Sequence, residues 1–228
     1  MGDKKQKEAR IKKVKQVLVV GACVLFVILM ILSGMSSHWL SVFTVVKPGD
    51  TVVVDYTMYD ATGIPVLTSS QQTYTTAAAN GRYILYSKQL SMTAGQNLTK
   101  SIYPVSISTG SSDLTTQFAL LNTEYGAINQ AIIGMKTGDQ KRIQIPNSSE
   151  PNLWDDANVT RSGLNVSDLN VGDLLPMAMS DNPEAMATNS TITYTRLGEI
   201  MSKTDDGIVV DVNYPAVDIS LVSINVNS

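Results

Sequence analysis

The clearest hydrophobic pattern along the chain changes from a helical period to a strand period within the segment Gly126–Pro146. Ile128, Ala131, Ile132 and Met135 follow one another at intervals of three, one and three residues. This spacing places their side chains on one stripe of a helix, and such a stripe packs against a core. The pattern therefore predicts an amphipathic helix at the start of the segment.

A turn and a strand are predicted directly after this helix. Gly138 and Asp139 are residue types that allow the backbone to reverse. In Lys141–Ile145, isoleucines alternate with polar residues, which is typical of a half-buried strand. Pro146 ends the strand because proline has no N–H for a ladder hydrogen bond.

A second alternating pattern lies nearer the N-terminus. In Thr51–Tyr59 every second residue is apolar, which predicts a strand with one buried face. The turn-forming residues of Asp60–Gly63 follow, and Ile64–Ser70 has the composition of a further strand. Together these stretches predict a pair of neighbouring strands.

A long apolar run precedes both patterns. Val17–Met35 is almost wholly aliphatic, and nineteen residues of helix would span about 28 Å, close to the thickness of a bilayer core. The run is longer than the apolar part of a typical secretory signal. We therefore predict a transmembrane anchor whose partner is membrane lipid, through residues 17–35.

The distribution of charge predicts how this anchor is oriented. Seven of the seventeen Lys and Arg residues lie at or before Lys15, so the rest of the chain has ten basic and eighteen acidic residues. Basic residues beside an apolar span stay in the cytoplasm, where they contact anionic lipid. The basic residues could instead bind nucleic acid, but their position beside an apolar span favours lipid, so we predict no nucleic-acid partner. It predicts a single-pass protein of the cell membrane with a cytoplasmic N-terminus and its main domain on the outer face.

The composition excludes several classes of site. With 43% hydrophobic and 16% charged residues among 228, the chain is expected to fold. Cys23, inside the apolar run, is the only cysteine, and His38 is the only histidine, so neither a disulfide framework nor a metal site is predicted. Glycine-rich phosphate loops and hydrolase motifs are absent from the sequence, and we predict no cofactor.

The two patterned segments together resemble the FKBP family of peptidyl-prolyl cis-trans isomerases. One is KPGDTVVVDYTMYDATGIPVLTSS, from Lys47 to Ser70, and the other is AIIGMKTGDQKRIQIP, from Ala131 to Pro146. Further along, LNVSDLNVGDLLPMAMS and DDGIVVDVNYP are similar in order to the inserted flap domain of the SlyD-like branch. In this chain Tyr214 replaces the histidine that is usual in the last of these stretches.

The resemblance implies an α+β fold, with an antiparallel sheet wrapped on a short helix and a small, mainly β flap domain. The expected division of the chain is a tail, anchor and linker at 1–46, a first part of the core at 47–158, a flap domain at 159–208 and a closing core strand at 209–228. Two stretches of the core, 71–103 and 111–124, are longer than the family pattern and are expected to be insertions.

The resemblance also implies an apolar pocket for a proline ring. The residues that it assigns to this site are Tyr56, Val66, Leu67, Val105, Ile128, Ile145, Trp154 and Tyr214. Two departures weaken the match. Leu67 stands where the family usually has an aspartate, and the tyrosine expected shortly after Pro146 is missing, although Trp154 could replace its ring.

The flap domain of the SlyD-like branch captures unfolded chains, and the corresponding segment here contains Met177, Met179 and Met186. Flexible thioether side chains adapt to varied apolar partners, which suits such a role. The same methionines could equally fill a small β core.

The expected function is that of a membrane-anchored isomerase and folding chaperone acting on proline-containing or unfolded polypeptides. Rotation about the prolyl bond needs no nucleophile or metal, because excluding water from the imide favours the twisted transition state. The main alternative is a binding or scaffold module whose pocket has degenerated, as Leu67 suggests. A third interpretation, a surface adhesion or assembly subunit, draws on the Ser, Thr and Asn content of the insertions.

Overall fold

The computed structural model describes residues 15, 17–27, 30, 44–108, 115–147, 150–181 and 194–225. The chain divides into two units, Met1–Thr44 and Val45–Ser228, and we describe each by itself. In the first unit the described residues up to Met30 are helical.

None of the helices among the described residues is long and apolar enough to span a membrane. The predicted anchor and the predicted single-pass location are therefore wrong. Residues 28–29 and 31–35 of the predicted span lie outside the described residues.

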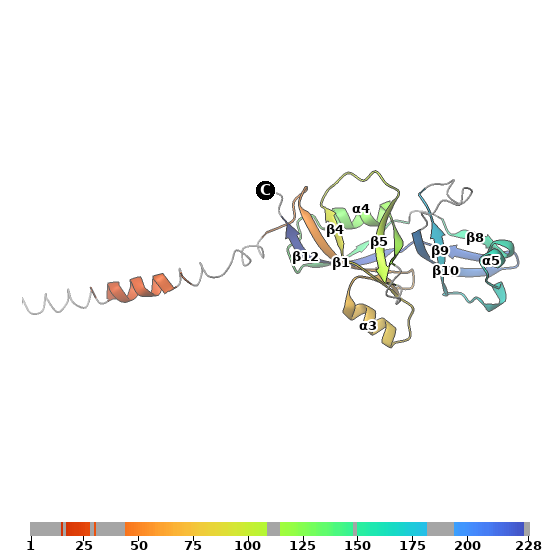
Figure 1. Cartoon of the computed structure of the whole chain (residues 1–228), viewed down its shortest axis with the longest axis horizontal. Coiled ribbons are helices and arrows are strands. Elements are labelled where there is room, and N and C mark those ends of the chain that lie inside the picture. The colour runs from red at the N-terminus through yellow and green to blue at the C-terminus, as the bar shows by residue number, and fades with distance from the viewer. Residues whose placement is uncertain are drawn as a thin grey trace, which may run out of the picture. The chain divides into compact units, whose positions relative to one another are not determined.

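The second unit is built mainly from strands (Figure 1). Their bounds in the first half are β1 Thr51–Tyr59, β2 Pro65–Thr68, β3 Leu85–Ser87, β4 Leu90–Thr93, β5 Ile102–Ser108 and β6 Thr115–Leu121. In the second half they are β7 Gln140–Gln144, β8 Asn152–Asp155, β9 Leu174–Met179, β10 Tyr194–Thr204, β11 Gly207–Asp211 and β12 Ala216–Asn225. The helices are α3 Gln71–Ala79, α4 Asn122–Ala131, α5 Asp156–Arg161 and the 3-10 helix η1 Val166–Asp168.

All of these strands belong to one sheet, and its order corrects the predicted fold class. The strands follow one another as β7-β12-β1-β2-β3-β5-β6-β10-β11-β8, with β4 on β1 and β9 on β10. The pairs β2–β3 and β6–β10 are parallel, so the sheet is mixed rather than antiparallel. The fold is mostly β with short helices, and the α+β prediction is wrong.

The stretches predicted as insertions explain much of this difference. Residues 71–103 supply β3 and β4, and residues 111–124 supply the described strand β6. Leu85, Leu90 and Phe118, one from each strand, are buried in the same core as β1. The two stretches extend the common sheet because their apolar side chains are buried by it.

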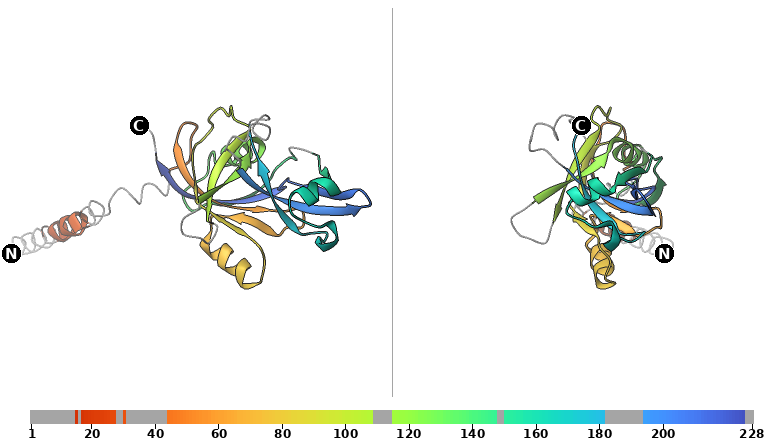
Figure 2. Two further views of the ribbon diagram at one scale, coloured as in Figure 1. Left: turned by 45° about the vertical axis from the view of Figure 1, so that its right-hand side comes forward. Right: turned by 90° about the vertical axis from the view of Figure 1, so that its right-hand side faces the viewer.

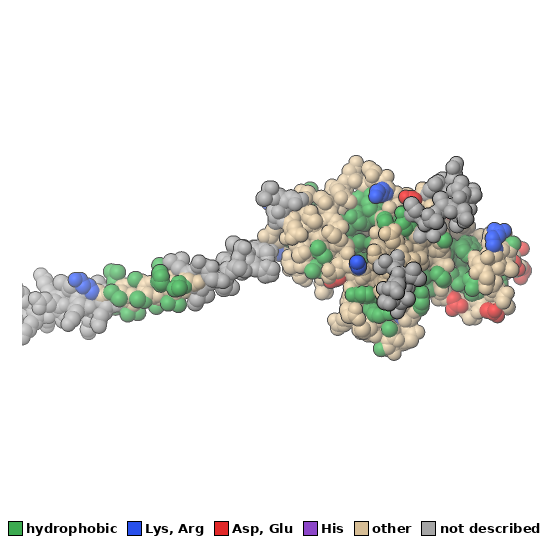
Figure 3. All heavy atoms as spheres, in the orientation of Figure 1, with side chains coloured by type: hydrophobic (Ala, Val, Ile, Leu, Met, Phe, Trp, Pro, Cys, Tyr) green, Lys and Arg blue, Asp and Glu red, His purple; other side chains and the backbone are tan. Residues whose placement is uncertain are grey.

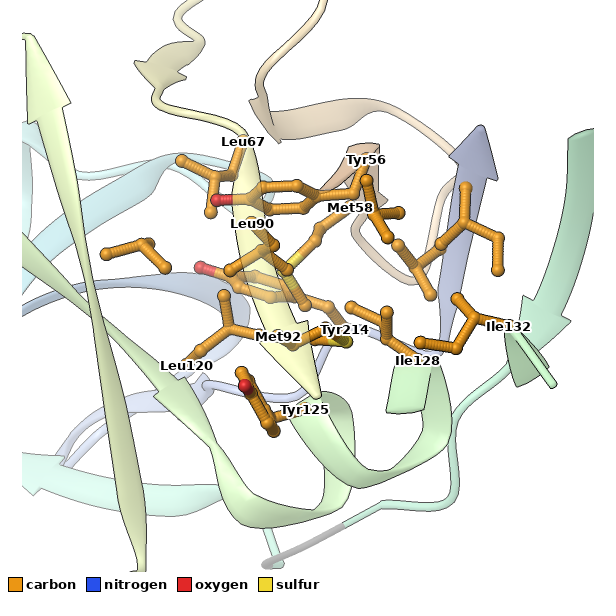
Figure 4. Packing of buried hydrophobic residues seen from close by; sticks show 14 of the residues in the cluster. Tyr56, Met58, Leu67, Leu90, Met92, Leu120, Tyr125, Ile128, Ile132 and Tyr214 are labelled. Carbon is orange, nitrogen blue, oxygen red and sulfur yellow. The ribbon is translucent and has the colours of Figure 1, made fainter. Parts of the chain in front are cut away.

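The first core lies between β1 and α4. Alternate residues of β1 point into it, and Tyr125, Ile128 and Ile132 enter from α4 and its C-terminal end (Figure 4). The helix begins before the predicted segment because the Glu124 carboxylate accepts a hydrogen bond from the Leu121 N–H at 2.9 Å. A carboxylate at this position satisfies an N–H that the helix itself leaves unpaired.

A second, smaller core forms in the part of the chain that lies between β7 and β12. These two strands pair with each other, and the residues between them include a lobe, which we define as Asn152–Asp211. Val159, Leu169, Leu175, Ile200, Ile208 and Val210 form the buried cluster of this lobe. Figure 2 shows the long blue strands β10 and β11 that reach into it.

Strand β10 connects the two cores. Leu197 is buried in the first core and Ile200 in the second. Between them, a Cβ on Gly198 would lie 2.4 Å from Val210 Cγ1 and 2.6 Å from Met177 Sδ. A larger residue here would have to displace the side chains of Val210 and Met177, so glycine lets β10 pack closely against them.

Arg196, also on β10, is completely buried and paired with Glu124 of α4. Its NH1 group donates to Ala119 O and Glu124 Oε2, each at 2.8 Å, and its NH2 group donates to Glu124 Oε1 at 2.5 Å and to Val212 O. Its Nε donates to Val212 O at 2.9 Å. All five guanidinium hydrogens thus have acceptors.

We expect Glu124→Gln to lower the free energy of unfolding by about 3–5 kcal/mol, because the substitution leaves the buried Arg196 charge without a counter-charge. The matched control is Asp218→Asn, which breaks the Arg142–Asp218 pair, whose side chains are 52% and 42% exposed. That change should cost less than about 1 kcal/mol. Urea denaturation of the full chain measures both, and equal losses would contradict a special role for the buried pair.

Candidate functional site

The residues predicted to form the proline pocket mostly come together, but they form a filled core. Tyr56, Val66, Leu67, Val105, Ile128, Ile145 and Tyr214 belong to the first core. They come from β1, β2, β5, α4 and the segments that follow β7 and precede β12. Tyr56 is 1% exposed, and Leu67 and Ile128 are 0% exposed. The side chains assigned to the pocket wall therefore contact one another.

The Tyr56 hydroxyl is buried in this core without a hydrogen-bond partner. Figure 4 shows its oxygen beside Leu67, which offers no acceptor. Burial raises the pKa of Tyr56, and the Ser87 side chain nearby lowers it in part. The Ser87 hydroxyl does not form a hydrogen bond of normal geometry with the Tyr56 hydroxyl, and it has no other hydrogen-bond partner. The Tyr56 and Ser87 hydroxyls are thus two neighbouring buried polar groups that no other side chain satisfies.

Tyr214 lies in the same core but is fully satisfied. Its hydroxyl donates to Leu197 O at 2.7 Å, and the Arg196 guanidinium lies 4.3 Å from the centre of its ring. Burial raises the pKa of Tyr214, and the charge of Arg196 offsets part of the increase. These contacts tie Tyr214 to Leu197 and Arg196 of β10.

Trp154 and the methionines lie elsewhere, in the lobe. Trp154 is on β8, and it packs half-buried against the second core. Met177 packs against the same core from β9, and Met179 is half-buried at the end of that strand. Met186 lies outside the described residues. The structure does not bring Trp154 together with Tyr56, and Met177 faces the lobe core.

A hollow of about 490 Å³ lies beside β1, β7 and β12, and most of the side chains that line it are polar. Asp55 and Tyr59 of β1, Arg142 of β7 and Asp218 of β12 line it, together with the start of α3. The Tyr59 hydroxyl donates to Asp218 Oδ2 at 2.8 Å, and the Arg142 guanidinium lies 4.4 Å above the Tyr59 ring. Burial and Asp218 raise the pKa of Tyr59 to about 12. Tyr59, Arg142 and Asp218 therefore contact one another across this hollow.

The lobe exposes apolar side chains that the sequence analysis did not single out. Leu153 of β8 is 51% exposed and Met201 of β10 is 39% exposed. Leu153 pairs with Val209 of β11, and a bulge in β10 places Met201 and Ser202 opposite Val209. The alternation of Asn152–Asp155 could have indicated an outward-facing leucine, but not its neighbours on other strands.

The described ranges contain no group of three or more His, Cys, Asp or Glu side chains that could hold a metal ion. In comparisons with known proteins, no family model matches the chain, and no curated protein matches it. The resemblance to the FKBP family still rests on the sequence segments themselves.

Two matched substitutions test whether the Tyr56 hydroxyl is unsatisfied. We expect Tyr56→Phe to raise the free energy of unfolding by about 1 kcal/mol, because it removes a buried polar atom that has no partner. Tyr214→Phe should lower it by about 1–2 kcal/mol, because it removes the hydrogen bond to Leu197 O. Urea denaturation gives both values. A loss of stability in Tyr56→Phe would mean that the hydroxyl has a partner, such as a buried water.

Proposed function

We propose that this chain is a polypeptide-binding module that does not catalyse proline isomerisation. The observation that carries the proposal is the burial of Tyr56, Leu67 and Ile128, which are at most 1% exposed. An isomerase of the kind that the sequence resembles needs an open apolar pocket at this position. Here the same side chains are packed together in the first core, which argues against such an opening.

The energetics of isomerisation support this reasoning. The barrier to rotation of a peptide bond is about 18–20 kcal/mol, and each tenfold acceleration requires about 1.4 kcal/mol of selective stabilisation of the transition state. Admitting a proline ring would first require core side chains such as Val66 and Tyr56 to be displaced. Displacing large buried side chains costs several kcal/mol, as the loss of such side chains from cores does. This cost works against any gain in rate.

The lobe supports the binding part of the proposal. Its outer sheet face carries Leu153 and Met201, which remain accessible while the rest of the lobe packs around its own core. Accessible apolar side chains on a strand-rich surface are suited to contact apolar segments of another chain. We therefore place the binding surface on the lobe rather than at Tyr56.

A combined assay separates binding from catalysis. At protein concentrations that saturate binding, we expect exchange NMR to give the same cis/trans rate for a proline-containing peptide as for the free peptide. An unfolded polypeptide labelled with a fluorophore should show a rise in anisotropy with the same protein. Acceleration of exchange by substoichiometric protein would overturn the proposal and favour an isomerase.

The control for this assay is a change within the core that leaves the lobe intact. Tyr56→Phe keeps the ring and its packing, so neither binding nor the exchange rate should change. Loss of binding in Leu153→Ser but not in Tyr56→Phe would locate the binding surface on the lobe.

A further inference from the structure

The outer face of the lobe carries a continuous row of apolar side chains, which we call the apolar row: Leu153, Val209 and Met201. The row crosses β8, β11 and β10 through the pairing of Leu153 with Val209 and the bulge opposite Val209. The neighbouring Ile200, Ile208 and Val210 point to the other face, where they are buried. Because successive strand residues alternate between faces, the row lies on the outer surface.

Four aspartates gather beside the apolar row, and we call them the acidic tip: Asp155, Asp156, Asp205 and Asp206. Asp155 follows Leu153 by two residues on the same face of β8 and pairs with Gly207, directly after the β10–β11 turn. The Asp156 N–H donates to Asp206 O at 3.3 Å, which joins the start of α5 to this turn. All four side chains are exposed.

The acidic tip has no ion-pair partner among the described residues, since no Lys or Arg there lies within salt-bridge distance of the four aspartates. Asp155 also caps α5, because its carboxylate accepts a hydrogen bond from the Asn158 N–H at 2.7 Å. The nearest basic side chains in sequence have other partners, since Lys203 donates to Leu169 O and Arg161 donates to Asn158 Oδ1. Figure 3 shows several red carboxylates at this end of the molecule, with a blue basic group beside them. A ligand at the apolar row therefore experiences a negative field within the Debye length of about 8 Å.

We propose that the lobe selects polypeptide segments in which apolar side chains are accompanied by Lys or Arg. The apolar side chains cover the row, and the basic side chains face the acidic tip. Leu153 and Asp155 are two residues apart on one strand face, about 7 Å. The matching partner has a basic residue about two positions from an apolar one in an extended segment. This inference rests on the proposed binding function and adds the chemistry of the partner.

Charge decides between this partner and other occupants. Nucleic acid carries phosphates that the acidic tip repels. A second copy of the lobe has the same negative charge, so an arrangement that places the two acidic tips side by side costs free energy. A basic, apolar polypeptide meets complementary charge and complementary apolar surface at the same time.

The test uses two labelled peptides with the same apolar residues, one with Lys and one with Glu at the charged positions, titrated by anisotropy against the full chain. We expect the Lys peptide to bind more tightly, and the difference to shrink in 0.5 M NaCl. Asp205→Asn together with Asp206→Asn should weaken the Lys peptide about fivefold, as expected for the loss of two exposed charge pairs. Asparagine keeps the turn chemistry of both positions.

Asp139→Asn is the control, because Asp139 is also an exposed turn aspartate but lies before β7, outside the lobe. It should leave both affinities unchanged. Leu153→Ser should weaken both peptides alike. If the two peptides bind equally and the aspartate substitutions have no effect, this inference is wrong while the binding function stands. If neither peptide binds, the proposed function itself fails, and sedimentation then shows whether the row is covered by a second copy.

Discussion

The burial of the Arg196 charge is the constraint on which the rest of the second unit depends. Removing a guanidinium from water costs several kcal/mol unless its charge and all its hydrogens are satisfied. Burial alone would lower the pKa of Arg196, but the adjacent Glu124 carboxylate raises it, so the group remains charged. Its acceptors come from β6, from the start of α4 and from Val212. These elements must therefore hold their positions together.

This constraint explains why the lobe and the first core share strands instead of forming separate domains. Arg196 and Gly198 lie two residues apart on β10, and each contacts chain segments that are distant in sequence. Glu124 also accepts from the Leu121 N–H, so the same carboxylate sets where α4 begins and where β10 lies. The predicted flap domain, 159–208, contains Arg196, whose partner Glu124 belongs to the predicted first part of the core. The lobe is therefore attached to the first core through Arg196 and Leu197 of β10.

Local patterns were sufficient to predict the elements with strong periodicity. Thr51–Tyr59 is a strand with the predicted alternation, and the segment after Gly126 contains the predicted helix and strand, although the helix begins four residues earlier. The strand order was not predictable in this way, because the parallel pairs join segments whose register depends on distant partners. Arg196 carries no signal in the sequence that separates it from an exposed arginine. Its burial follows only from the position of Glu124.

The candidate site shows a further limit of sequence patterns. Tyr56, Val66 and Ile128 are apolar or aromatic in the sequence whether they line an open pocket or fill a core, and the difference lies in the volume between them. Leu67 is the residue that could have indicated the filled state. An aspartate at this buried position would need hydrogen-bond partners or water, whereas leucine needs neither and packs against apolar neighbours. If this space admits no ligand, as we propose, the exposed apolar side chains of the lobe are left to contact other polypeptides.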